Sequence, residues 1–240
     1  MKKRKIVFLF ALFLLISLIV FSGYKTVVFA LEDKKIKEEI NHVNDMVKVI
    51  ANDILNDNKI KLYQEKYQNE DIIGILSIDG VITTPLVQTD NNNYYLNHLV
   101  NKNYNKTGSI FVDYRTDIDK SKQVNIFGHS STIYDIPFNN LKKYLNENFY
   151  KEHKILTIET ENNIYTYEIF AVKVTSDEEH LNIFYQNNSE FEEHLQKLKS
   201  DALYEINVDV SDNDSILTLQ TCIFNDPRGS LLIINLRKVG

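Results

Sequence analysis

The hydrophobic pattern opens with an apolar stretch that predicts a membrane anchor. Residues 6–24 carry no charge and are mostly Ile, Val, Leu and Phe. As a helix these 19 residues span roughly 28 Å, close to the ~30 Å hydrocarbon core of a bilayer. The basic tail at 1–5 favours the cytoplasm, which directs the rest of the chain outward in a single pass. Val28-Phe29-Ala30 leaves open a cleaved signal peptide, which exports the domain equally.

A helical pattern follows the apolar stretch. Residues 31–55 carry one apolar stripe at steps of three and four, which indicates an amphipathic helix. The stripe consists of Ile36, Ile40, Val43, Val47, Ile50 and Ile54. It either packs on the domain or pairs with a partner helix. A weaker helix is predicted at 59–67, so we assign 25–70 to an N-terminal helical segment.

From residue 71 the pattern changes to short strands separated by turns. Asp79-Gly80 is typical of a tight hairpin turn. The predicted strands are 72–78, 81–83, 109–114, 123–127, 155–159, 164–174, 206–210, 215–221 and 231–236. Many strands without regular intervening helices favour a mainly β domain over 71–240, a closed barrel or a sandwich.

One helix interrupts the late strands. Ser189 and Glu192 form the S-x-x-E pattern of a capping box. Phe191, Leu195 and Ala202 follow at helical spacing. We therefore predict a helix at 189–202, between two strands of the sheet.

Charge limits the classes of partner. Five of the 27 basic residues lie in the first 30 positions, which hold no acid, so the exported part has 22 basic and 33 acidic residues. It contains no basic tract, which argues against nucleic acid as a partner.

Cys222 is the only cysteine, at the end of the run LTLQTC at 217–222. An exported protein with one cysteine cannot use it for an internal disulfide, so a nucleophile is a serious hypothesis. The alternative is a small buried apolar residue.

His129 is the histidine best placed to serve as a base. It follows an apolar strand and a glycine, and strand-end loops often carry catalytic side chains. The other five histidines lie in helical, charged or polar segments. No metal-binding spacing such as H-E-x-x-H or a cysteine pair is present in the sequence.

Arg228 is the arginine that the expected hairpin brings near Cys222. If 215–222 and 231–236 pair antiparallel, Arg228 emerges from the turn beside the Cys222 end, with strands about 4.8 Å apart. Arg237 would lie roughly 30 Å along the strand. A solvated turn residue is the alternative interpretation of Arg228.

These motifs together resemble a class B sortase. LTLQTC at 217–222 is similar to the family's strand with its nucleophile, and NIFGH at 125–129 to the element that carries its histidine. The segments GSIFVDYR at 108–115 and FNNLKKY at 138–144 also look like class B segments, and Arg228 is the best match to the family arginine. The resemblance covers roughly 70–240. Two departures are Gly229-Ser230, which separate Arg228 from the last strand, and Phe127 in place of a frequent Tyr.

The resemblance implies a closed eight-stranded β-barrel with N-terminal helices and a helix between strands 6 and 7. It implies a membrane-anchored cysteine transpeptidase that needs no metal or organic cofactor. Its partners would be the sorting-signal peptide of exported proteins and a peptidoglycan precursor or stem-peptide amine.

The resemblance also implies the roles of the site residues. Cys222 would be the nucleophile, His129 the acid and base, and Arg228 the residue that positions substrate and stabilises the oxyanion. Candidate residues of the substrate groove are Ser130, Gln220 and Thr221. Two alternatives are a cell-wall cysteine peptidase that hydrolyses without transfer, and a non-catalytic anchored surface-binding protein.

Overall fold

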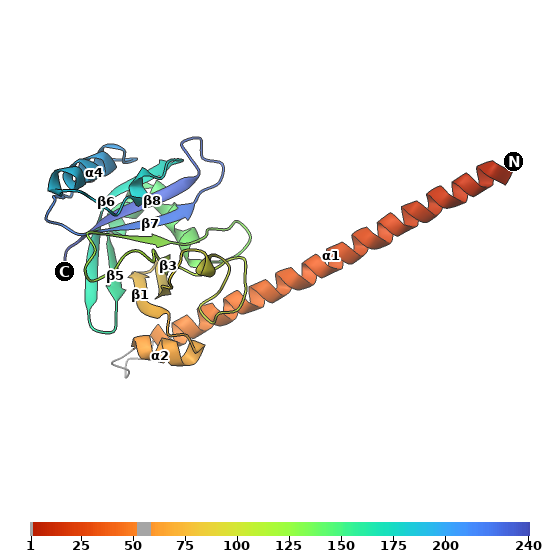
Figure 1. Cartoon of the computed structure of the whole chain (residues 1–240), viewed down its shortest axis with the longest axis horizontal. Helices are drawn as coiled ribbons and strands as arrows, with labels where there is room; N and C mark the ends of the chain where they lie inside the picture. The colour runs from red at the N-terminus through yellow and green to blue at the C-terminus, as the bar shows by residue number, and fades with distance from the viewer. Residues whose placement is uncertain (1, 52–58) are drawn as a thin grey trace. The chain divides into compact units, whose positions relative to one another are not determined.

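The computed structural model describes residues 2–51 and 59–240, and the chain divides into two compact units, Met1–Asn44 and Asp45–Gly240. Helix α1 (Lys2–Ala51) runs through the predicted anchor and most of the predicted stripe (Figure 1). The end of that stripe, Ile54, lies outside the described residues. The domain boundaries expected at 24 and 70 stay predictions.

The N-terminal part of α1 has the properties of a membrane span. It is long and apolar enough to cross a bilayer, and its large apolar side chains from Val7 to Phe21 are exposed. Such a surface suits lipid, since a helix satisfies its own backbone hydrogen bonds there. The helix therefore fits a membrane anchor.

Helix α2 (Lys59–Tyr67) has the predicted bounds and closes one side of the second unit. The Tyr63 hydroxyl donates to the Val47 carbonyl at 3.2 Å, and Val47 and Ile50 are buried. The last turns of α1 thus pack within the domain. For this C-terminal part of the apolar stripe, the prediction that it packs on the domain is confirmed.

Eight strands form a closed barrel in the order β1-β2-β3-β4-β7-β8-β6-β5. They are β1 (Ile72–Ile78), β2 (Ile82–Val87), β3 (Phe111–Val112), β4 (Gln123–Phe127), β5 (Ile155–Glu159), β6 (Ile164–Thr175), β7 (Ile216–Cys222) and β8 (Leu231–Lys238). β1 and β2 form the predicted hairpin, and Gly80 has φ +67° in its turn, a conformation that favours glycine. The predicted fold class is confirmed.

The barrel interior is the hydrophobic core. Fully buried side chains from several strands meet there, among them Leu76, Leu156, Ile158, Leu217, Leu219 and Ile234. Two short helical segments, η2 (Pro137–Leu145) and α3 (Glu147–Glu152), extend this core with Phe138, Leu141 and Tyr144. The core holds the strand ends in place and so fixes the position of the residues beyond them.

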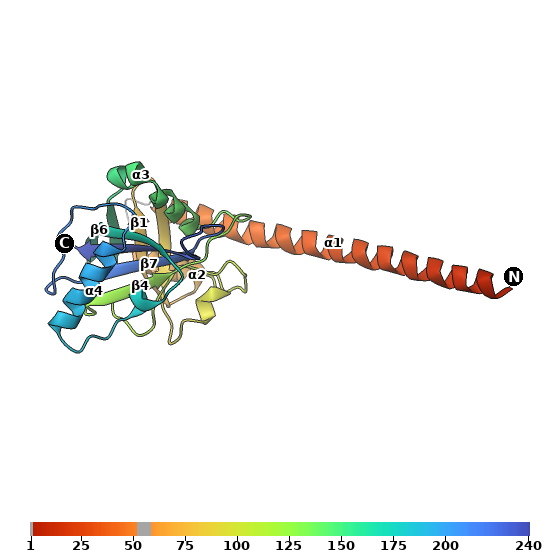
Figure 2. The same cartoon turned by 90° about the horizontal axis from the view of Figure 1, so that it is seen from above.

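Helix α4 (Asn188–Ser200) lies between β6 and β7 in the chain and covers the outside of the barrel beside β6 (Figures 1 and 2). It buries Phe191, Leu195 and Leu198. The predicted cap was wrong by two residues: Asn187 is the N-cap and accepts from the Glu190 N–H at 3.0 Å.

Three strand predictions were wrong in extent or type, and the first is 81–83, where β2 runs from Ile82 to Val87. Only Phe111–Val112 of the range 109–114 is a strand. Residues 206–210 are irregular although Ile206, Val208 and Val210 are buried, because both edges of β6, β7 and β8 are already paired in the closed barrel. Side chains bind carbonyls of this segment instead, such as Lys199 to the Val208 oxygen at 2.9 Å.

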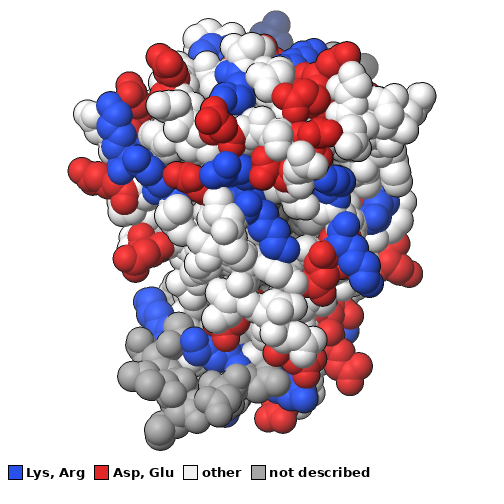
Figure 3. Space-filling view, turned by 90° about the vertical axis from the view of Figure 1, so that its left-hand side faces the viewer, with Lys and Arg blue, Asp and Glu red and all other residues white. Residues whose placement is uncertain are grey.

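Charges of both signs are interspersed over the face of the molecule in Figure 3. Several cations are paired in the structure, including Lys120 with Asp117 and Lys151 with Glu147. Exposed pairs of this kind contribute little stability individually. The apolar core therefore stabilises the fold more than the surface charges do.

Candidate active site at the ends of β4 and β7

Strand register brings His129 and Cys222 to the same edge of the barrel. β4 and β7 are parallel neighbours, and Phe127 pairs with Gln220. The Gly128 N–H donates to the Gln220 carbonyl at 3.2 Å, which continues the ladder past the end of β4. Because both strands run in the same direction, His129 and Cys222 follow these paired residues by two positions each and leave the sheet side by side.

Cys222 presents a free, exposed thiol at the last position of β7. Its carbonyl accepts a hydrogen bond from the Ser130 hydroxyl at 2.5 Å. Ser130 thus ties the His129 loop to the end of β7. The alternative of a buried structural cysteine is wrong.

The His129 ring is half-buried and oriented by the backbone. Its Nε2 lies 3.0 Å from the Leu96 carbonyl oxygen, which can only accept, so Nε2 carries a proton. In the neutral ring the basic nitrogen is then Nδ1. A fixed tautomer of this kind is what an acid–base histidine requires.

The glycine before His129 is required by packing. A Cβ at Gly128 would meet the ring of Phe138, with Cδ2 at 2.7 Å, and the side chain of Ile110. Both neighbours are buried in the core. Any larger residue would therefore displace either these core side chains or the segment that carries His129.

The candidate residues surround a cavity of about 280 Å³. It is lined by Asn92, Asn93, Leu96, Phe111, Phe127, Gly128, His129, Gln220, Thr221 and Cys222. Of the predicted residues, His129, Gln220, Thr221 and Cys222 line it, and Ser130 contacts the Cys222 carbonyl. The structure therefore gathers five of the six predicted site residues.

Arg228 is the one that does not line this cavity. Its guanidinium binds the Asp226 carboxylate through two hydrogen bonds, at 2.8 and 2.6 Å, in the β7–β8 turn. These bonds lower the pKa of Asp226 to about 2, so the carboxylate stays ionised and paired above that pH. The hairpin itself is confirmed: Cys222 pairs with Leu231, whereas Arg237 pairs with Ile216 at the far end.

A second cation lies near the nucleophile. Lys142 on η2 is half-buried, and its ammonium lies 5.1 Å from the centre of the Phe224 ring, two residues after Cys222. Burial lowers the pKa of Lys142, and attraction to the Cys222 sulfur opposes that effect. Lys142 therefore adds positive potential on this side of the thiol.

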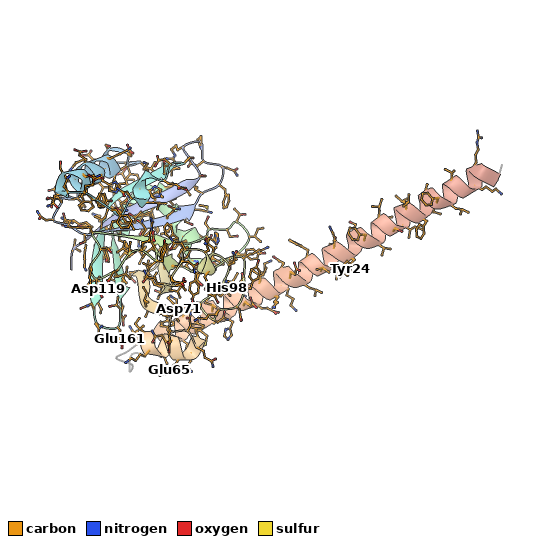
Figure 4. All side chains as sticks on the ribbon, in the orientation of Figure 1. Tyr24, Glu65, Asp71, His98, Asp119 and Glu161 are labelled. Carbon is orange, nitrogen blue, oxygen red and sulfur yellow. The ribbon has the colours of Figure 1, made fainter. Side chains whose placement is uncertain are left out.

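The connection between β2 and β3 supplies a wall that the sequence did not predict. It carries Leu96 and is fixed by polar contacts: Tyr95 donates to Asp71 at 2.8 Å, and Ser109 to the His98 carbonyl at 2.9 Å. Asp71 and His98 are labelled in Figure 4. No local motif marks this polar Asn- and Tyr-rich segment as part of the site, because its position depends on contacts distant in sequence.

The described residues contain no cluster of three or more His, Cys, Asp or Glu side chains that would hold a metal ion. The cavity wall offers a nucleophile and a base, Cys222 and His129, and the cations Lys142 and Arg228 lie outside its lining. This nucleophile and base suit acyl transfer through a thioester.

Residues 75–234 match the sortase domain family. The chain belongs to the sortase family. Sortase B of Listeria monocytogenes is 38% identical over 157 residues, 64% of this chain and 63% of that relative, so the alignment spans less than two thirds of its length. Sortase B of Staphylococcus aureus is 26% identical over 215 residues, 87% of this chain and 86% of that protein.

Solved structures agree with this assignment. The sortase superposes on Clostridium perfringens sortase B with a TM-score of 0.69 and 28% identity, over 75% of this chain and 99% of that one. These similarities support class B.

Proposed function

We propose that this sortase cleaves a C-terminal sorting signal of exported proteins after Thr and transfers them to a cell-wall amine. The observation that carries the proposal is the pairing of β4 and β7, which sets an exposed thiol and an oriented imidazole on the wall of one cavity. Family membership supports the same reaction class.

In the first half-reaction the Cys222 thiol gives its proton to His129, and its sulfur attacks the carbonyl carbon of the Thr residue. The C–N bond then breaks, and His129 gives a proton to the leaving amine. The product is a thioester between Cys222 and the exported protein. The cavity is large enough for only part of the signal, so the rest of the peptide lies along its open side.

In the second half-reaction the acceptor amine of a peptidoglycan precursor or stem peptide attacks the thioester. His129 removes its proton, an amide forms, and the Cys222 thiol is regenerated. The enzyme itself needs no metal or organic cofactor for these steps. Water in place of the amine would give hydrolysis, the reaction of a cysteine peptidase.

Arg228 is proposed to bind the substrate and stabilise the oxyanion, since a guanidinium donates to two oxygens at once. In the structure its guanidinium is bound to Asp226. The proposed role therefore requires that Arg228 exchange this carboxylate for the substrate. Ser130, Gln220 and Thr221 are proposed as groove residues.

We further propose that the catalytic domain is extracellular and that residues 6–24 of α1 are a retained single-pass anchor. The basic tail at 1–5 supports this orientation. The domain would then face exported proteins and cell-wall precursors on the extracellular side of the membrane.

The proposal is tested by incubating the full-length sortase with a library of Thr-containing peptides, with and without an added amine such as triglycine. Transfer predicts a new product in which the Thr carboxyl end is joined to the amine. Cleavage that yields the free acid alone at saturating amine would identify a peptidase instead. No cleavage of any peptide, together with slow thiol alkylation, would favour a non-catalytic binding protein.

A further inference from the structure

A buried polar network lies beneath the cavity, on the face of the sheet that Cys222 shares. Side chains at alternating positions of β4 and β7 form it: Gln123, Asn125 and Thr218 are buried, and Gln220 is half-buried where it lines the cavity. Gln123 donates to the His180 carbonyl at 2.7 Å, and Asn125 to the Leu181 carbonyl at 3.3 Å. These bonds fix the segment η3 (Glu179–Leu181) of the β6–β7 connection onto the sheet.

His180 is the buried member of this segment, with 1% of its surface exposed. Its Nε2 lies 2.6 Å from the Gln220 side-chain oxygen, which can only accept, so Nε2 is the donor. Burial lowers the pKa of His180, which keeps the ring neutral. Its Nδ1 has no hydrogen-bond partner within the described parts of the chain. Within those parts, the hydrogen bond to Gln220 is therefore the one that the ring makes.

The same contact orients the Gln220 amide. Its oxygen is bound by His180, so its NH₂ group points elsewhere, and Gln220 lines the cavity. Among the residues that the structure describes, none is found to accept a hydrogen bond from this nitrogen. An oriented donor at the cavity wall is a group that recognises a carbonyl oxygen.

Gln220 and Cys222 are two positions apart and therefore lie on the same face of β7, roughly 6–7 Å apart along the strand. An extended peptide advances by about the same distance over two residues. A donor at Gln220 is thus placed to meet a carbonyl about two residues from the one that Cys222 attacks.

We infer that His180 is a positioning residue, which holds the Gln220 amide so that it donates a hydrogen bond to a peptide carbonyl of the bound substrate. The inference rests on the proposed function and adds a determinant of substrate recognition to it. His180 acts through Gln220 and does not touch the reacting atoms.

The test uses the full-length sortase in detergent micelles and two thiol reagents. One is a peptide chloromethyl ketone that ends in Thr and carries the residues of a peptide that the wild type cleaves. The other is iodoacetamide, which has no peptide to recognise. The variants are His180→Leu, Gln220→Leu and the double variant, with His153→Leu as a histidine control outside the cavity lining.

Loss of one neutral hydrogen bond predicts that each single variant reacts about five-fold more slowly with the peptide reagent. The double variant should react no more slowly than Gln220→Leu, because His180 acts through that side chain. Iodoacetamide should react with all of them at the wild-type rate, and His153→Leu should match the wild type throughout.

A general structural role of His180 predicts a different pattern. The two single-variant reductions in the rate of the peptide reagent would then multiply in the double variant, or the reaction with iodoacetamide would slow to the same degree. Either result would overturn the inference. If Leu at position 180 impairs folding, His180→Gln and His180→Asn make the same comparison. Gln reaches the place of Nε2 and should restore the peptide selectivity, whereas the shorter Asn should not.

The catalytic activity and the role of His180 can fail separately. Absence of Cys222-dependent cleavage in the wild type would reject the proposed function. Normal wild-type cleavage with equal peptide selectivity in His180→Leu would reject the role of His180 alone.

Discussion

Gly128→Ala is the change that most directly links packing to catalysis in this structure. The new Cβ would lie 2.7 Å from Phe138 Cδ2 and would also collide with Ile110. Both neighbours are buried, so neither can turn out to solvent. Either the core yields or the segment that carries His129 moves.

Overpacking of this kind costs about 1–3 kcal/mol. For a domain of about 200 residues, each kcal/mol lowers the melting temperature by about 2–4 °C. We therefore expect a melting temperature lower by about 2–12 °C. Turnover should fall at least ~ten-fold, because a misplacement of about 1 Å in a catalytic group can cost 100-fold.

Gly80→Ala provides the matched control. It lies in the β1–β2 turn, at the other end of β2 from Val87, which pairs with β3 at the site edge. No atom lies within 4 Å of the position that a Cβ would take there, but φ +67° makes alanine strained by about 1 kcal/mol. It should lower the melting temperature and leave turnover unchanged. Wild-type turnover in Gly128→Ala would refute the reasoning.

Three further predictions test the site and the anchor. Arg228→Lys should lower turnover about ten-fold, because lysine cannot donate to two oxygens at once as a guanidinium does. Arg237→Lys, at the far end of β8, should leave turnover unchanged. If both variants turn over at the wild-type rate, a group other than Arg228 stabilises the oxyanion. Lys142→Met should slow alkylation of Cys222 by iodoacetamide about three-fold, because the Lys142 ammonium attracts the Cys222 sulfur that attacks the reagent, and the exposed Lys143→Met should have no effect. Equal slowing by both would show a general charge effect. N-terminal sequencing of the membrane-bound protein should find the chain intact; a start at Leu31 would identify a cleaved signal peptide.

Local patterns predicted the elements that local forces determine. β1, β4, β5 and α2 have the predicted bounds, because apolar alternation or helical spacing is bounded there by turn residues. Residues 206–210 show the limit of this reasoning. Their alternation is real, but a strand needs a free edge, and the closed barrel leaves none.

Some residues of the candidate site are likewise marked by a local sequence pattern, and others are not. Cys222 and His129 stand out in sequence because each ends an apolar strand, and the parallel register then brings them together. Leu96, Lys142 and His180 reach the site through packing between distant segments, which no local motif records. The Asp226–Arg228 pair follows from side-chain geometry within the turn, where the sequence indicated only turn-forming residues.

The central claim is that Cys222 forms a thioester with the sorting signal. Mass spectrometry of the intact sortase, mixed with a cleaved peptide and quenched in acid, measures it directly. The account predicts a mass increase equal to the peptide fragment that ends in Thr, located at Cys222 and released by hydroxylamine as the hydroxamate. Cys222→Ala should show neither adduct nor hydroxamate. A hydroxamate formed by Cys222→Ala, or an acyl group on another residue, would contradict the claim.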